Sequence, residues 1–277
     1  LENADDIREL LSKNTKMVFI TAGMGGGTGT GAAPVIAQVA KELDILTVGI
    51  VTTPFGFEGG KRKNQASQGI DEMRKYVDSL IIINNDKVRE HYGNLKLSEA
   101  FCKADDILTV AAKGISELIT IPGYMNVDFE DVKAIMKNSG IAIMGTGIAE
   151  GEDRAQKAVE LALNSPLLND NEIYGARNVL LFISSGEDEV SMDEVSDISD
   201  YIQNAAGSTA EVIWGTGTDL SLGNNISVTV VATNFNKSAS PLKSVTEEPQ
   251  VITLQHEVRQ ELPMAEPEPE MKVVVKP

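Results

Sequence analysis

The sequence predicts an α/β fold, with a Rossmann-like parallel sheet in its first part and a mixed sheet in its second. Short apolar runs such as 80–83 alternate with helical patterns over residues 1–94, as expected for strands buried on both faces of a parallel sheet. A long helical pattern follows, and residues 122–235 then alternate again but end in two successive strands. A glycine-rich run between the first strand and the next helix indicates where a ligand binds.

The first part contains three predicted strands, each followed by a helix. Its elements are helix 3–13, strand 16–22, helix 31–43, strand 46–52, helix 59–77, strand 79–84 and a long helix over 96–121. The long helix carries an apolar stripe along one face. It would extend about 39 Å at 1.5 Å per residue, which suits a helix that links two subdomains.

The second part is expected to form a smaller α+β domain. Its elements are helix 129–138, strand 139–149, helix 152–163, strand 177–185, helix 190–205 and strands 209–217 and 224–235. A short connection containing Gly223 and Asn224 joins the last two strands and predicts a hairpin. The proline-rich composition after Phe235, without aromatic residues, predicts a disordered linker. The chain therefore divides into 1–94, 95–121, 122–138, 139–235 and 236–277.

The composition excludes several classes of function. The formal charge of −17 disfavours binding to nucleic acid or to anionic lipid. No apolar stretch approaches the roughly 20 residues of a membrane span, so we expect no direct membrane insertion. The single cysteine, Cys102, is typical of a reducing cytoplasm. The two histidines, His91 and His256, lie far apart without nearby cysteine, so no protein metal site is predicted.

The glycine-rich run has the composition of a phosphate-binding loop. Five glycines in seven residues let the backbone approach an anion closely, and two hydroxyl groups add hydrogen-bond donors. The N-terminus of the following helix contributes backbone N–H groups and partial positive charge. The predicted phosphate-binding residues are Gly25, Gly26, Gly27, Thr28, Gly29, Thr30 and Gly31.

Other phosphate-binding motifs fit this run less well. A P-loop requires Lys and then Ser or Thr after its last glycine, whereas Ala32 and Ala33 follow Gly31. The relaxed Rossmann fingerprint is met by Gly27, Gly29 and Ala32, but that fold requires an acidic residue after the second strand. Thr53 and Pro54 occupy that position. A dinucleotide-binding oxidoreductase therefore remains an alternative, although a disfavoured one.

Four motifs in order resemble the FtsZ family of the tubulin/FtsZ superfamily. They are the glycine run 25–31, the segment TPFGFEGGKR at 53–62, AFCKADD at 100–106 and PGYMNVDFEDV at 122–132. The resemblance extends over residues 1 to about 235. It implies a tubulin-like GTPase domain, a central helix and a second domain. Family members begin with further strands, so the resemblance predicts that residues 1–94 are only part of the GTP-binding domain.

The resemblance assigns ribose and purine contacts to two further segments. Thr53, Pro54, Glu58 and Arg62 would lie near ribose and phosphates. Glu58 and Arg62 are four residues apart, so an exposed ion pair is the alternative. Phe101 and Asp105 are also four apart, which allows an aromatic ring to stack on guanine while a carboxylate accepts its N–H groups.

Alternatives exist for this purine site. Phe101 could instead be a core residue and Asp105 a surface charge. Because Asp106 is adjacent, the carboxylate that accepts from guanine could also be that of Asp106.

The resemblance places the catalytic residues Asn126, Asp128 and Asp131 in a loop that acts on the nucleotide of the next subunit in a filament. Carboxylates can polarise and orient the water that attacks a phosphoryl group. The structural alternative is a capping box, with Asp128 as the N-cap of helix 129–138 and Asp131 three residues later. Both roles are compatible, because a cap fixes the geometry that catalysis requires.

The function implied is a GTPase that binds GTP or GDP with Mg²⁺ and assembles head-to-tail into the bacterial division ring. It would be cytoplasmic, at the division site. Family members also bind membrane-tethering and regulatory proteins through a C-terminal peptide, which we do not find in this sequence. The alternative is a filament scaffold that has lost hydrolysis, since a partial nucleotide domain would bind GTP poorly by itself.

Overall fold

Seven strands form one mixed sheet in the computed structural model, which describes residues 4–93, 95–165 and 173–235. Strands β1 (Met17–Gly23), β2 (Leu46–Thr53), β3 (Ser79–Asn84) and β4 (Gly140–Ala149) are mutually parallel. The sheet continues through β7 (Ile226–Thr233) and β5 (Asn178–Ser185) to β6 (Glu211–Thr218) at the edge. The predicted disordered linker 236–277 lies outside the described residues.

The predicted hairpin between the last two strands is wrong. Strand β7 lies between β4 and β5 and is antiparallel to both, whereas β6 pairs in parallel with β5. Burial explains this order. All but one residue of β7 are buried, as expected for a central strand, whereas β6 is largely part-exposed and contains two glycines.

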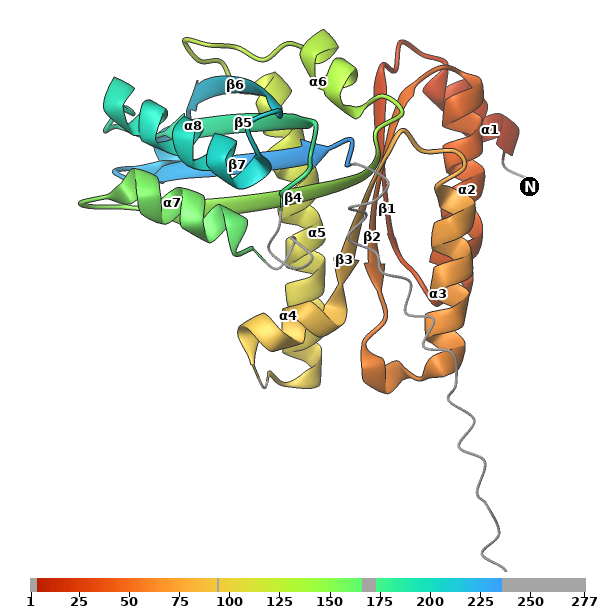
Figure 1. Ribbon diagram of the computed structural model, residues 1–277. Coiled ribbons are helices and arrows are strands. Elements are labelled where there is room, and N and C mark those ends of the chain that lie inside the picture. The colour runs from red at the N-terminus through yellow and green to blue at the C-terminus, as the bar shows by residue number, and fades with distance from the viewer. Residues whose placement is uncertain (1–3, 94, 166–172, 236–277) are drawn as a thin grey trace, which may run out of the picture. The chain divides into compact units, whose positions relative to one another are not determined.

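Helices cover both faces of the sheet (Figure 1). In the first half, α2 (Gly27–Glu42) and α3 (Gly60–Met73) pack on one face of β1 and β2, with α1 (Ala4–Leu11) against α2. In the second half, α7 (Arg154–Leu163) and α8 (Met192–Ala206) pack together, and both contribute to the core beneath β4, β5 and β7. The other face carries α5 (Leu97–Thr120) and α6 (Phe129–Met136).

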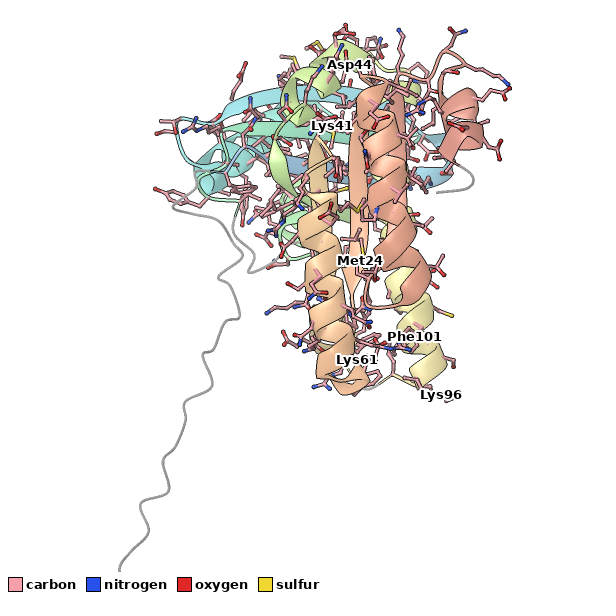
Figure 2. The ribbon with its side chains drawn as sticks, turned by 90° about the vertical axis from the view of Figure 1, so that its right-hand side faces the viewer. Met24, Lys41, Asp44, Lys61, Lys96 and Phe101 are labelled. Carbon is pink, nitrogen blue, oxygen red and sulfur yellow. The ribbon has the colours of Figure 1, made fainter. Side chains whose placement is uncertain are left out.

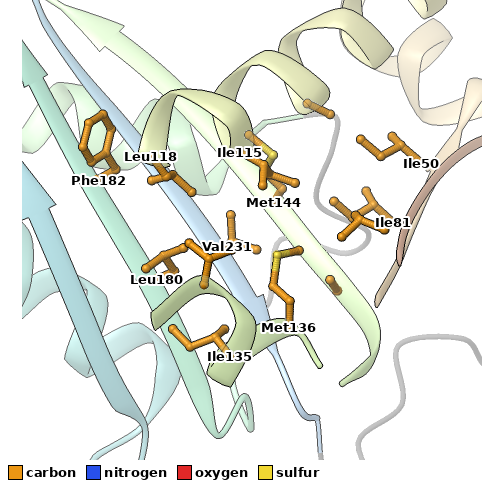
Figure 3. Packing of buried hydrophobic residues seen from close by; sticks show 14 of the residues in the cluster. Ile50, Ile81, Ile115, Leu118, Ile135, Met136, Met144, Leu180, Phe182 and Val231 are labelled. Carbon is orange, nitrogen blue, oxygen red and sulfur yellow. The ribbon is translucent and has the colours of Figure 1, made fainter. Parts of the chain in front are cut away.

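One apolar core joins the two halves of the sheet. Ile115 and Leu118 of α5 lie between Ile50 and Ile81 of the first half and Leu180 of the second (Figure 3). All five are at most 1% exposed. Burying each such side chain stabilises the fold by about 1.5–3 kcal/mol, so α5 is held rigidly across both halves.

The largest differences between the sequence-based elements and the structure are at α2, α3 and α4 (Asn85–Tyr92). Helix α2 begins at Gly27, inside the predicted loop, and α3 ends at Met73 instead of 77. Helix α4 was not predicted, because its sequence is mostly polar and shows no apolar period. Its start is marked by Asn84, whose side chain accepts a hydrogen bond from the Asp86 N–H. None of the described helices is long and apolar enough to cross a membrane.

A buried arginine links the loops of the second half. Arg154, 6% exposed, makes two hydrogen bonds to the Glu194 carboxylate at 2.7 and 3.1 Å and one to Asp188 at 2.7 Å. It also donates to the backbone carbonyl groups of Asp188, Glu189 and Asn224. The hydrogen bond from Arg154, assisted by Ser191, lowers the pKa of Glu194 to about 2.

We expect this carboxylate to make stability depend on pH. The pKa of Glu194 is lower in the folded than in the unfolded chain, so its contribution is present above pH 4.5 and is lost as the pH falls towards 2. At about 1.4 kcal/mol per pKa unit the contribution is about 3 kcal/mol. Chemical denaturation of Glu194→Gln should therefore give a lower unfolding free energy than wild type at pH 7 and the same value near pH 2. Glu160→Gln, at a part-exposed site of α7, is the control. An equal loss at both pH values would contradict the assignment.

Candidate functional site

A tight turn joins β1 to α2 and forms the centre of the candidate site. Gly25 adopts a positive φ of 98°, which glycine tolerates without strain. Its N–H donates a 2.9 Å hydrogen bond to the Thr30 hydroxyl. The adjacent Met24 is buried, and its N–H bonds to the Thr52 carbonyl at 2.9 Å. The turn is therefore fixed to both β2 and the first turn of α2.

Two of the glycines are required for packing, and others leave open space. A Cβ at Gly29 would lie 2.3 Å from the Gly23 carbonyl oxygen, and one at Gly25 would lie 2.9 Å from the Arg62 carbonyl oxygen. At Gly26, Gly27 and Gly31, in contrast, a Cβ would meet no atom within 4 Å. The backbone thus presents an accessible surface beside a tightly packed turn.

The start of α2 is suited to bind an anion. No side chain caps its N-terminus at Gly26, so the N–H groups of the first turn lack partners within the helix. These groups and the helix dipole favour a phosphate at this point. Glycine disfavours helix by about 1 kcal/mol per residue, which is why the sequence predicted a loop at the residues where α2 begins.

The segment 53–62 lies against this turn. Pro54 is buried, and its Cγ would be 3.3 Å from a Cβ at Gly25. The Thr53 hydroxyl reaches Asn84 at 3.4 Å, and the Gly56 N–H donates to Asp86 at 2.8 Å. The structure therefore brings the predicted ribose segment and the glycine turn together at the carboxyl ends of β1, β2 and β3, where parallel sheets bind ligands.

Glu58 and Arg62 form the ion pair that their spacing predicts. The Arg62 guanidinium contacts the Glu58 carboxylate at 2.5 Å. The other Glu58 oxygen accepts a 2.8 Å hydrogen bond from the Phe55 N–H. The Glu58 side chain is only 11% exposed and that of Arg62 is 58% exposed, so Glu58 is held in place while Arg62 can move towards a ligand.

Phe101 lies in the same half of the view as Met24, which adjoins the glycine turn (Figure 2). It is 41% exposed and packs edge-on against Phe55, with ring centroids 5.2 Å apart. Asp106 forms an ion pair with Lys103 at 3.2 Å. Within the described residues, the exposed Asp105 carboxylate has no such partner. Asp105 is therefore the more available of the two carboxylates for a ligand.

Asn85 is a polar residue of this region that the sequence analysis missed. It is the first residue of α4, is 5% exposed, and its Oδ1 is buried without a hydrogen-bond partner in the described structure. Leaving a buried acceptor unpaired typically destabilises a protein by about 1–3 kcal/mol, so this oxygen is available to accept a hydrogen bond from bound water or from a ligand. Asn85 could have been found from the sequence, because it lies directly after a buried strand and therefore at the same sheet edge as Thr53.

The three predicted catalytic residues are ordered by hydrogen bonds to the backbone. The Asp131 N–H donates to the Asp128 carboxylate at 2.9 Å, and the Asp128 N–H donates to the Asp131 carboxylate at 3.1 Å. This confirms the predicted capping box. The Asn126 side-chain oxygen accepts a 2.8 Å hydrogen bond from the Gly123 N–H. Each side chain keeps further lone pairs for a ligand.

These three residues do not meet the glycine turn within one chain. The predicted purine-contacting residues Phe101 and Asp105 lie near the start of α5, whereas Asn126, Asp128 and Asp131 follow its end. Helix α5 has 24 residues, a length of about 36 Å at 1.5 Å per residue. Figure 1 shows α4 beside the start of this helix and α6 beyond its other end. The described residues contain no cluster of three or more potential metal-binding side chains.

Comparisons with known proteins identify the family. Residues 1–93 match the model of the Tubulin/FtsZ family GTPase domain, and residues 140–236 match that of the FtsZ family C-terminal domain. The solved "FtsZ dimer, empty" of M. jannaschii is 42% identical, with a TM-score of 0.78 over 84% of this chain and 67% of that chain. The chain belongs to the FtsZ family.

FtsZ relatives in bacteria are more similar in sequence. "Cell division protein FtsZ" of Porphyromonas gingivalis is 51% identical over 83% of this chain and 51% of the relative. That of Wigglesworthia glossinidia brevipalpis is 49% identical over 88% of this chain and 64% of the relative. The chain thus spans about half to two thirds of the length of these FtsZ proteins. CetZ1 from Haloferax volcanii, a "GDP bound monomer", is 20% identical with a TM-score of 0.70 and shows the same fold.

Proposed function

We propose that this FtsZ-family chain belongs to a GTPase that polymerises head-to-tail and completes its active site between neighbouring subunits. The observation that carries the proposal is the separation of the two halves of the site along α5. A chain that cannot bring Asp128 and Asp131 to its own glycine turn can bring them to that of the next subunit. Such a heterologous contact repeats without closing and generates filaments.

The nucleotide would be held by the residues gathered at the carboxyl ends of β1–β3. The N–H groups of residues 25–31 would receive the phosphates, and the exposed Thr28 hydroxyl would add a donor. Thr53, Pro54, Glu58 and Arg62 would surround the ribose. Phe101 would stack on guanine while Asp105 accepts hydrogen bonds from its N–H groups, which adenine does not offer in the same arrangement.

The catalytic residues would come from the next subunit. Asp128 and Asp131, each with one carboxylate oxygen fixed by the capping box, would orient the attacking water with the other. Asn126 would position the loop against the γ-phosphate. Arg62 is the one cation among the predicted nucleotide contacts, so bound Mg²⁺ would supply the further positive charge that the phosphates require.

By membership of the FtsZ family, the proposed biological role is the bacterial division ring, in the cytoplasm at the division site. We also propose that other division proteins bind the complete protein, as they bind other family members through the C-terminal region.

The test is GTP hydrolysis by the complete protein at increasing protein concentration. We expect turnover per molecule to be near background below a critical concentration and to rise steeply above it, as sedimentation detects polymer. Turnover per molecule that does not depend on concentration would contradict a shared site. GTP binding and polymer without hydrolysis would favour the scaffold alternative.

A further inference from the structure

The loop that carries the acidic residues lies along the edge strand β6. The Thr216 N–H donates a 2.9 Å hydrogen bond to the Met125 carbonyl, and the Met125 N–H donates to the Thr216 hydroxyl at 3.3 Å. The Thr218 N–H donates to the Pro122 carbonyl at 3.3 Å. The loop thus pairs with the outer side of β6, which is remote in sequence, as Figure 1 shows.

Glycines allow this close approach. A Cβ at Gly123 would lie 1.7 Å from the Thr216 carbonyl oxygen. A Cβ at Gly215 would lie 2.5 Å from Val127 and 2.9 Å from the Met125 carbonyl oxygen. Contacts below 3.0 Å do not occur without a shift of one partner, so any side chain at these positions would move the loop away from β6.

The contact with β6 fixes the part of the loop that leads to the acidic residues. Val127 is 4% exposed and is seated over Gly215. Asn126 precedes it and Asp128 follows it, and both are exposed. Their direction is therefore set by the seating of Met125 and Val127 on β6, in addition to the capping box of α6.

We propose that Gly215 and Thr216 are positioning residues for the catalytic loop of the subunit interface. The proposal rests on the proposed function, because it concerns the same acidic residues. A misplacement of about 1 Å at a reacting group can lower a rate by about 100-fold. A loop displaced from β6 would therefore reduce hydrolysis on the neighbouring subunit while its own nucleotide site, at the other end of α5, remains intact.

The test uses the complete protein with Gly215→Ala, Thr216→Val and Thr216→Ser. For Gly215→Ala we expect kcat per sedimented subunit to fall by about 100-fold, with the Kd for GTP unchanged. Thr216→Val removes the hydroxyl that accepts from Met125 and should lower kcat by a smaller factor. Thr216→Ser retains the hydroxyl and should have a kcat near that of wild type.

Gly147→Ala is the matched control, because Gly147 lies on β4, away from the loop. A Cβ there would clash as severely, at 2.1 Å from the Ala158 carbonyl oxygen. It should lower stability without lowering kcat in sedimented polymer. A wild-type kcat for Gly215→Ala would overturn the proposal, as would an equal loss in Gly147→Ala.

Amide hydrogen exchange of Met125 and Thr216 separates this proposal from the proposed function. We expect faster exchange at both in Gly215→Ala than in wild type. If the wild-type protein does not hydrolyse GTP, the proposed function fails. The seating of the loop on β6 is tested separately, because unchanged amide exchange of Met125 and Thr216 in Gly215→Ala would overturn it.

Discussion

Replacing Asp131 by alanine is expected to abolish GTP turnover while nucleotide binding and assembly persist. The carboxylate would orient the attacking water, and such groups typically contribute about 10²–10⁴-fold to a rate. The loss in stability should be only about 1 kcal/mol, because one hydrogen bond of the capping box is removed. Phosphate release, GTP binding and sedimentation measured on the same preparation distinguish these effects.

Two further variants separate catalysis from capping. Asp128→Asn keeps a residue type that caps helices well, so it should retain the stability of α6 and still lose most turnover. Glu130→Ala removes an exposed acid that pairs with Lys133 at 3.4 Å and should leave turnover intact. Normal hydrolysis by Asp131→Ala, or an equal loss in Glu130→Ala, would show that the loop does not act through these named carboxylates.

The second large effect is expected for Gly29→Ala. The added methyl group would lie 2.3 Å from the Gly23 carbonyl oxygen, which is backbone and cannot rotate away. The start of α2 must therefore shift, and its N–H groups leave the phosphates. We expect GTP affinity to fall by about 100-fold, equivalent to about 2.7 kcal/mol, measured by equilibrium titration.

Gly147→Ala serves as the control for Gly29→Ala, because its clash with the Ala158 carbonyl is as severe but lies in the second half of the chain. It should lose stability and keep GTP affinity. If both variants lose GTP affinity equally, the effect reflects general destabilisation. The close approach of Gly29 to Gly23 would then not be what positions the N–H groups of the predicted phosphate turn.

The sequence predicted most elements because their apolar periods agree with their burial. Strand β3 and helix α5 were found within one or two residues of their observed bounds. The position of β7 between β4 and β5 could not be found from local spacing, because strand order depends on which strands are buried on both faces. A turn signal between β6 and β7 was therefore misleading.

The residues of the candidate site were predicted from motifs in the sequence. The features that were missed depend on contacts between residues far apart in the chain. The capping box of Asp128 and Asp131 and the pair Glu58–Arg62 follow from spacing along the chain. The unpaired oxygen of Asn85 becomes visible only after folding buries it. The contact of the predicted catalytic loop with β6 joins residues about 90 positions apart, which no local pattern encodes.

The most direct test of the shared active site mixes two inactive variants of the complete protein. Gly29→Ala retains the acidic loop but is expected to bind GTP about 100-fold more weakly, so it is used at a GTP concentration that leaves its site largely empty. Asp131→Ala retains the nucleotide site but loses a predicted catalytic carboxylate. Each alone should release phosphate near background. Because the loop of one subunit would complete the site of the next, the mixture should hydrolyse GTP well above the sum of the two. A mixture no more active than that sum would contradict an active site formed between subunits.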